Sequence, residues 1–70
     1  MNTIRLKKFV DGTGITLEQL SKQTSIPITI LTTMYYDGIF DGTKVDVNQL
    51  TSLMQLLNII NINDLIPSIN

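Results

Sequence analysis

Hydroxyl and apolar side chains recur at helical spacing in the middle of the chain. They are Ile28, Thr29, Thr32, Thr33 and Tyr36. Residues three and four apart share one face of a helix, so we expect these side chains to lie together, away from Leu31 and Met34. Threonine hydroxyls donate or accept hydrogen bonds, and the methyl groups of isoleucine and threonine pack on thymine methyl groups. This chemistry suits the edges of DNA bases with a leaning toward A·T pairs, although the bidentate Arg, Gln or Asn contacts of strong base discrimination are absent.

Six side chains elsewhere in the sequence are candidates for contacts with phosphates. They are Arg5, Lys7, Lys8, Thr16, Lys22 and Lys44. The net charge of −1 argues against strong non-specific binding, because Lys and Arg supply most of that affinity. Residues 1–44 hold five bases and four acids, whereas residues 45–70 hold two acids and no base, so one end is mildly basic. Two or three contacts per subunit of a dimer predict a log–log salt slope of about −4 to −5.

Catalytic and metal-binding chemistry is poorly supported by the composition. The chain has no cysteine and no histidine, and Glu18 is its single glutamate. No glycine-rich phosphate loop or paired-carboxylate pattern is present, so we expect no enzyme and no cofactor. Asp37 and Asp41 are each followed by glycine, and we interpret both as turns because the alternating oxygen ligands of a calcium loop are absent.

The elements that would position these residues are short helices. Seventy residues with 43% hydrophobic content allow one small domain, here taken as residues 1–70. Apolar periodicity and capping signals predict an all-α fold with no competing strand pattern. The five predicted helices span about residues 3–11, 17–24, 27–36, 47–58 and 62–66.

Local signals set the ends of these helices. The turn signal Asp11–Gly12 predicts the end of the first helix. The second and fourth helices each begin with the spacing of a capping box, Thr16 with Gln19 and Asp46 with Gln49. Pro27 disfavours helical geometry at the preceding residue and suits the first turn of the next helix. The second and third helices therefore meet at a corner without a proper loop.

This arrangement resembles the Cro/repressor-like (XRE) helix-turn-helix family of phage and bacterial regulators over roughly residues 4 to 66. Leu20, Ile26, Leu31 and Met34 fall at the core positions of that motif, and Ser21 falls where a small residue lets the two helices cross closely. The tail NINDLI resembles the short fifth helix of the family. The resemblance implies a compact five-helix lambda-repressor-like domain whose third helix enters the major groove of DNA.

Two residues depart from the family pattern. Ser25 stands where the family favours glycine at the turn, and Leu17 stands where it often has a glutamine that contacts a phosphate. Serine can adopt a turn conformation and leucine can lie on a helix surface, so both departures concern the DNA contacts more than the fold.

The expected function is a sequence-specific, DNA-binding transcriptional regulator, a repressor or an autorepressor. A homodimer would place its two third helices about 34 Å apart on double-stranded DNA and would require a palindromic operator. The chain has more apolar residues than one small core normally needs. We therefore expect a dimer interface formed by Ile39, Phe40, Ile60, Ile62, Ile66 and Ile69.

An alternative of a different class stays open. The same scaffold would then bind another protein, with weak or no DNA binding, as in phage inhibitors, antirepressors or the amino-terminal helix-turn-helix domains of phage anti-CRISPR proteins. Residues 27–36 carry no charge, but this stretch is too short to span a bilayer. We therefore expect a cytoplasmic protein of a bacterial or phage-infected cell, without a membrane or a small-molecule substrate as partner.

Overall fold

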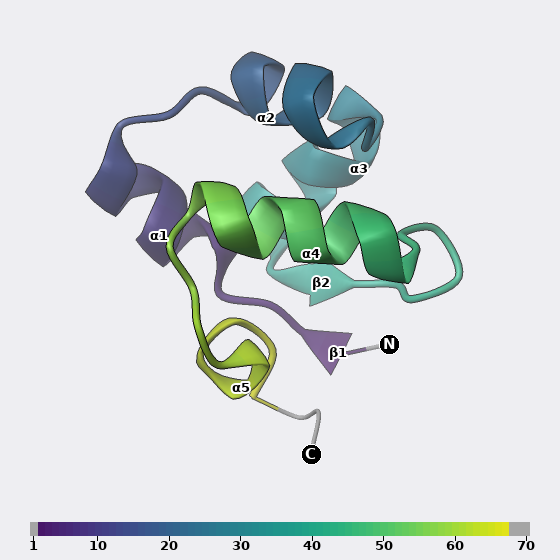
Figure 1. The fold of residues 1–70 in the computed structure, drawn as a ribbon. Helices are drawn as coiled ribbons and strands as arrows, with labels where there is room; N and C mark the ends of the chain where they lie inside the picture. The colour runs from purple at the N-terminus through teal and green to yellow at the C-terminus, as the bar shows by residue number, and fades with distance from the viewer. Residues whose placement is uncertain (1, 68–70) are drawn as a thin grey trace.

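Short helices follow one another along most of the chain (Figure 1). The computed structural model describes residues 2–67. The elements are β1 (Asn2–Thr3), α1 (Leu6–Thr13), α2 (Leu17–Thr24), α3 (Ile28–Thr32), a π-helical turn η1 (Thr33–Asp37), β2 (Ile39–Phe40), α4 (Val47–Leu56) and α5 (Ile62–Leu65). In Figure 1, α2 and α3 lie at one end of the molecule, α5 lies at the other, and α4 crosses between them.

A small antiparallel sheet corrects the prediction of an all-α fold. β1 pairs with β2, with Asn2 opposite Phe40 and Thr3 opposite Ile39. The N–H of Ile4 also donates to the carbonyl oxygen of Gly38, at 2.9 Å. Two residues per strand are too few for the apolar alternation that reveals strands in a sequence. The described residues therefore form a mostly helical domain of five α-helices and a two-stranded sheet.

The first helix is displaced from the predicted range of 3–11. Residues 2 and 3 lie in β1, and Ile4 enters the core from the segment between β1 and α1. Gly12 lies within α1, and the helix ends before Gly14, which has a φ of +75°. Only the second of these glycines adopts the left-handed conformation that ends a helix, so Asp11–Gly12 was the wrong stop signal.

The other helices begin close to their predicted positions. α2 has the predicted bounds, and both capping boxes are confirmed. The N–H of Gln19 donates to Thr16 Oγ1 at 3.1 Å, and the N–H of Gln49 donates to Asp46 Oδ1 at 2.7 Å. α4 and α5 end at Leu56 and Leu65, one or two residues before the predicted limits, a difference usual for helix ends.

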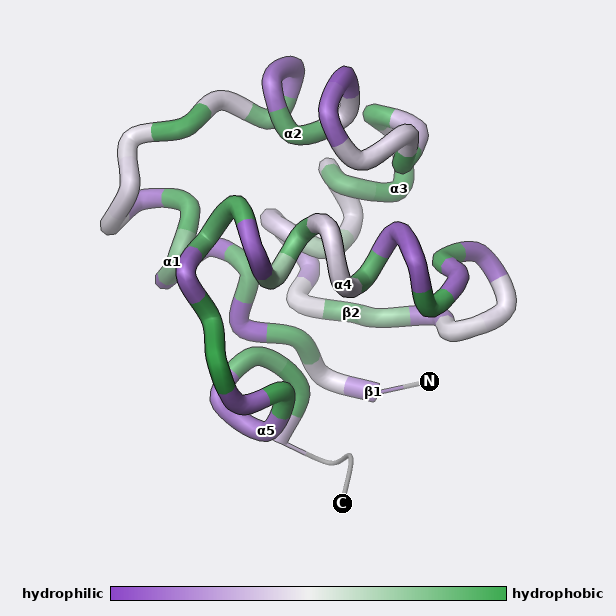
Figure 2. Tube along the Cα trace, in the orientation of Figure 1, coloured by the Kyte–Doolittle hydropathy of each residue, from purple (hydrophilic) through white to green (hydrophobic). Residues whose placement is uncertain are grey.

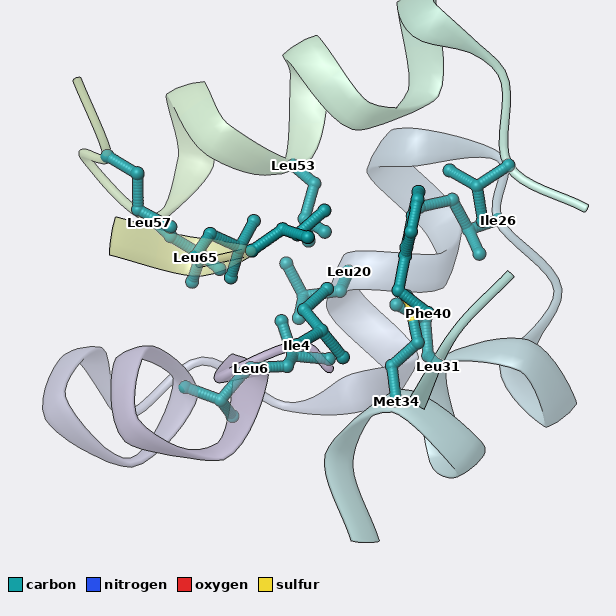
Figure 3. Packing of buried hydrophobic residues seen from close by; sticks show 14 residues of the cluster. Ile4, Leu6, Leu20, Ile26, Leu31, Met34, Phe40, Leu53, Leu57 and Leu65 are labelled. Atoms are coloured by element: carbon teal, nitrogen blue, oxygen red, sulfur yellow. The ribbon is translucent and has the colours of Figure 1, made fainter. Parts of the chain in front are cut away.

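Side chains from every helix meet in one hydrophobic core (Figure 3). Leu20, Ile26, Leu31 and Met34, the core positions expected from the sequence, are each at most 1% exposed. The rest of the core consists of Ile4, Leu6, Val10, Phe40, Val45, Leu53, Leu57, Ile59, Leu65 and Ile66. In Figure 3 the side chains from α3, η1 and β2 lie on one side of this core, and those from the end of α4 and from α5 lie on the other.

Two residues nominated for a dimer interface belong to this core. Phe40 is 5% exposed and Ile66 is fully buried, so neither offers surface to a partner. Both occur in segments that read as loop or tail in the sequence, but the sheet and α5 turn them inward. Ile60 is 98% exposed, Ile39 is 38% exposed and Ile62 is half-buried. Ile69, the sixth residue of the predicted dimer interface, lies outside the described residues.

The helices are short compared with the thickness of a membrane. Among residues 2–67, none of the helices has both the length and the apolar character needed to cross a bilayer. The longest, α4, has 10 residues, and a bilayer requires about 20 in helical form.

Candidate nucleic-acid interface

The connection between α2 and α3 consists of three residues, Ser25, Ile26 and Pro27. Ser25 has a φ of +64°, and its N–H donates to the carbonyl oxygen of Ser21 at 3.0 Å. The hydroxyl of Ser21 donates to the carbonyl oxygen of Ile26 at 2.6 Å. The small side chain of Ser21 therefore lets α2 approach the connection closely and also bonds to it.

A buried hydroxyl fixes the same connection from inside. Thr24 is 5% exposed, and its Oγ1 donates to the carbonyl oxygen of Leu20 at 2.6 Å. The same oxygen accepts from the N–H of Ile26 at 3.2 Å. A buried N–H without a partner is costly, so Thr24 stabilises the backbone at Ile26, where the chain turns into α3.

The start of α4 supports the connection from a third direction. Gln49 uses its side-chain oxygen to cap α4, where it accepts from the N–H of Asp46 at 3.0 Å. Its Nε2 donates to the carbonyl oxygen of Ser25, also at 3.0 Å. The side chain of Gln49 thus joins the start of α4 to the corner between α2 and α3. This bond helps to fix the direction in which α3 leaves the corner.

The exposed side of α3 and the first residue of η1 carry most of the candidate base-reading residues. Thr29, Thr32 and Thr33 are exposed and Ile28 is 40% exposed, whereas Leu31 on the opposite side is fully buried. The structure thus brings these four together on one outward face, which we call the threonine face. Figure 2 colours α3 green and near-white, in contrast to the purple segments of α2, because no charged residue lies in α3.

Two hydroxyls of the threonine face are bonded to their own helix. Thr32 Oγ1 donates to the carbonyl oxygen of Ile28 at 2.7 Å, and Thr33 Oγ1 donates to the carbonyl oxygen of Thr29 at 3.2 Å. Such bonds to the preceding turn are a common alternative for threonine in helices. They fix the side-chain rotamers of both residues.

Tyr36 lies in the π-helical turn η1, three residues after Thr33. The prediction of one regular helix over 27–36 is corrected here, because the chain is α-helical only to Thr32 and π-helical from Thr33 to Asp37. A π turn takes up about one residue more than an α turn, so the register of later side chains shifts. Tyr36 is 71% exposed and packs edge-on against Tyr35, with ring centroids 4.8 Å apart.

The ring of Tyr36 lines a hollow between α1, α2 and η1. The hollow has a volume of about 540 Å³, and its lining includes Asp11, Thr16, Glu18 and Tyr35. Thr16 is thus brought to Tyr36, but two carboxylate residues lie in the same hollow. Glu18 and Asp11 disfavour a phosphate at this position by charge repulsion. No local pattern groups these residues, because Asp11 lies on a different helix.

Two of the candidate lysines lie on either side of the threonine face. Lys22 lines a hollow of about 450 Å³ together with Ile28, Glu18, Gln19 and Ser21. Lys44 lines a smaller hollow of about 100 Å³, whose lining also includes Thr33 and Asp41. Lys22 thus lies near Ile28 at the start of α3, and Lys44 lies near Thr33, just after its end.

The three basic residues near the amino terminus are arranged differently. The N–H of Arg5 donates to the carbonyl oxygen of Leu65 at 2.8 Å, so Arg5 lies next to α5, at the end of the molecule away from α3 in Figure 1. The ammonium of Lys8 lies 5.6 Å from the ring centroid of Phe9, on its own helix. Neither contact brings these side chains to the threonine face.

Lys7 belongs to a cluster with Asp11 and Tyr35. Its Nζ lies 3.1 Å from Asp11 Oδ2 and 4.8 Å from the ring centroid of Tyr35. The hydroxyl of Tyr35 donates to Asp11 Oδ1. The bonds from Tyr35 and from Lys7 hold the pKa of Asp11 below its usual range, and the bond to Asp11 raises the pKa of Lys7. Lys7 is therefore paired with Asp11 in this structure, and its role as a phosphate ligand stays a prediction.

Charge on the candidate interface is close to balanced. Lys22 shares its hollow with Glu18, and Lys44 shares its hollow with Asp41. The Thr43 hydroxyl and backbone N–H donate to Asp41 and hold the pKa of its carboxyl below the usual range, so it stays ionised at neutral pH.

Neither family models nor curated proteins nor solved structures match this chain. Its function is therefore inferred from residues and geometry.

Proposed function

We propose that this chain is a sequence-specific DNA-binding transcriptional regulator, a repressor or autorepressor, built on a lambda-repressor-like helix-turn-helix domain. The observation that supports this most is the threonine face, an exposed and uncharged helix surface with Lys22 and Lys44 on either side. α3 enters the major groove, and the lysines contact phosphates next to it.

The rigid attachment of α3 supports this role. A helix that reads base edges must keep a fixed orientation, since base contacts are made over hydrogen-bond distances. Ser21, Thr24 and Gln49 each bond to the connection before α3, and Leu31 anchors the helix in the core. The left-handed Ser25 occupies the turn position where glycine is frequent in helix-turn-helix proteins.

A homodimer completes the proposal. Two lysines per subunit are few for tight binding, so two subunits on a palindromic operator supply the rest of the affinity. The domain measures 28 × 22 × 22 Å, and two copies side by side suit half-sites about 34 Å apart. Ile60 and Ile39 remain as the exposed members of the nominated interface. If sedimentation shows only monomer at working concentrations, the proposed homodimer is wrong, and the prediction of a palindromic operator fails with it.

The experiment that tests DNA binding begins with a pool of random-sequence duplexes. Rounds of selection on the immobilised protein enrich a motif, and anisotropy titrations compare the enriched duplex with a scrambled version. We expect submicromolar affinity for the enriched duplex that scrambling abolishes. Equal affinity for both duplexes would contradict sequence-specific recognition.

A double variant assigns the contact to α3. Thr29→Ala with Thr33→Ala should weaken binding to the enriched duplex by about tenfold or more, since each removed contact is worth about fivefold. Thr51→Ala is the matched control, because Thr51 is exposed on α4 and bonds to the carbonyl oxygen of Val47 in the same manner as Thr33 bonds to that of Thr29. If the double variant binds as the control does, α3 is not the reading helix.

One observation favours the alternative of a protein-binding module. The hollow lined by Asp11, Glu18, Tyr35 and Tyr36 combines carboxylates with aromatic rings, which suits a cationic side chain of a partner protein. If this alternative holds, an arginine-rich peptide shifts the NMR resonances of Tyr36 and Glu18, and the random duplex pool yields no motif.

If the chain is a DNA-binding regulator, Glu18→Gln increases its affinity for DNA, since the substitution removes a negative charge beside the bound phosphates.

A further inference from the structure

Two hydroxyl protons of the threonine face are already used within the helix. A threonine hydroxyl has one proton to donate and two lone pairs to accept with. The proton of Thr32 goes to the carbonyl oxygen of Ile28, at 2.7 Å, and that of Thr33 goes to the carbonyl oxygen of Thr29, at 3.2 Å. Toward a ligand in front of the helix, both oxygens therefore act as acceptors.

The same bonds fix the positions of the methyl groups. Rotation about χ1 exchanges the hydroxyl and methyl of threonine, so a bonded hydroxyl holds the methyl group in one direction. Ile28 lies one turn before Thr32 and is 40% exposed, which adds a further apolar group to the same stripe. Thr32 and Thr33 thus offer fixed acceptors and fixed methyl groups, side by side.

This pattern is complementary to only part of the major-groove code. An A·T pair presents the N6 amino donor of adenine and the C5 methyl group of thymine. Guanine presents two acceptors, N7 and O6, which repel an acceptor placed opposite them. A·T therefore meets the helix with one donor and one methyl group, whereas a G·C pair offers the N4 donor of cytosine, two guanine acceptors and no methyl group.

We propose that Thr32 and Thr33 make this chain selective for A·T pairs and selective against guanine in the base pairs under α3. Their hydroxyl oxygens accept from adenine N6, and their methyl groups contact thymine methyl groups. The inference rests on the proposed DNA-binding function and specifies its ligand. Thr29 is not part of the assignment, because its own hydroxyl is not among those bonded to the helix.

The test uses the duplex enriched from the random pool and base analogues within it. Replacing thymine by deoxyuridine removes only the methyl group, and replacing adenine by 2-aminopurine removes the N6 donor and keeps a pair with thymine. We expect each substitution under α3 to weaken binding, by about fourfold per methyl group and about fivefold per amino group. Substitutions outside the contacted base pairs serve as the control and should leave the affinity unchanged.

Two matched pairs of variants separate the two contacts. Thr32→Val with Thr33→Val keeps the methyl groups and removes the acceptors, so it should discriminate thymine from deoxyuridine but no longer adenine from 2-aminopurine. Thr32→Ser with Thr33→Ser keeps the acceptors and removes the methyl groups, so it should show the opposite pattern. Both residues are exposed, and thermal melting verifies that the variants remain folded.

The outcomes distinguish this inference from the function on which it rests. An enriched motif that contains guanine under α3, with binding weakened by 7-deazaguanine, would overturn the selectivity and leave the DNA-binding function standing. The selectivity is also overturned if the valine and serine variants lose both discriminations together. Failure of the pool to yield any motif would overturn the DNA-binding function, and the inference with it.

Discussion

Ser25 ends α2 in a backbone conformation that L-residues adopt at a cost. Its φ is +64°, and the side chain gains no bond that explains the choice of serine over glycine. Asn58, at the end of α4, has a similar φ of +57°. Asparagine tolerates this region better than serine does, so the two sites differ in how much strain they hold.

Ser25→Gly should therefore stabilise the domain. We expect a gain of about 0.5–1 kcal/mol, because relief of about 1–2 kcal/mol of backbone strain is partly offset by the greater freedom of glycine in the unfolded chain. Urea denaturation measures the change. Asn58→Gly is the control and should give a smaller gain, and an equal or larger gain there would show that backbone strain is not the cause.

Tyr35 and Asp11 make stability depend on pH. The pKa of Asp11 is lowered in the folded state, first by the hydroxyl of Tyr35 and then by Lys7. A lowered folded-state pKa stabilises the protein above the unfolded value of about 3.9, and this contribution is lost as the pH falls through the folded value. The cluster thus stabilises the contact between α1 and η1 at neutral pH and loses this effect in acid.

Removal of the Tyr35 hydroxyl should expose this dependence. Tyr35→Phe is expected to lower the free energy of unfolding at pH 7, and the difference from the unaltered protein should shrink below about pH 4 as Asp11 is protonated. Urea titrations at several pH values provide the measurement. Tyr36→Phe, which leaves the bond to Asp11 in place, should show no such convergence.

At the scale of elements, Gln19 and Gln49 have the same local role and different tertiary roles. Each accepts from the backbone N–H that begins its helix, at 2.9 Å in α2 and 3.0 Å in α4. Gln49 alone of the two also bonds to a second element, at the carbonyl oxygen of Ser25. The pair therefore allows the bond between elements to be measured separately from the capping box.

Gln49→Ala should cost more stability than Gln19→Ala. We expect the difference to be about 1 kcal/mol, the net value of one hydrogen bond. Thermal or urea unfolding of both variants gives this difference. Equal losses would mean that the bond to Ser25 contributes nothing, and that α3 is oriented by its hydrophobic contacts alone.

At the scale of the whole molecule, the charge of the candidate interface determines the salt dependence of DNA binding. Lys22 and Lys44 lie beside the threonine face, whereas Arg5 lies next to α5 and Lys7 is paired with Asp11. Two phosphate contacts per subunit predict a log–log salt slope of about −4 for a dimer and about −2 for a monomer. The slope of about −4 for a dimer is the smaller in magnitude of the two limits, about −4 and about −5, that the composition predicts.

Variants of single lysines test this assignment. Lys22→Gln should reduce the magnitude of the slope by about 2 in a dimer, one contact in each subunit, while sequence preference stays the same. Arg5→Gln is the matched control and should leave the slope unchanged. Equal effects of the two substitutions would show that DNA covers the α5 end as well.

Local signals in the sequence identified the helices and much of the core. The capping boxes at Thr16 and Asp46, the proline corner and the apolar periodicity act within a few residues, so the order of five helices follows from the sequence alone. The same periodicity predicted the buried Leu31 and the exposed threonines, because α-helical spacing holds as far as Thr32.

Contacts between distant segments decided the rest. β1 pairs with residues 39–40, Tyr35 bonds to Asp11, and Phe40 and Ile66 turn into the core, none of which has a local signal. The π turn changes the register at Tyr36, which lines a hollow together with Glu18. The sequence by itself determined which residues form helices, since that choice depends on neighbours along the chain. Only the tertiary structure decided which charges flank α3, because that depends on how the helices pack together.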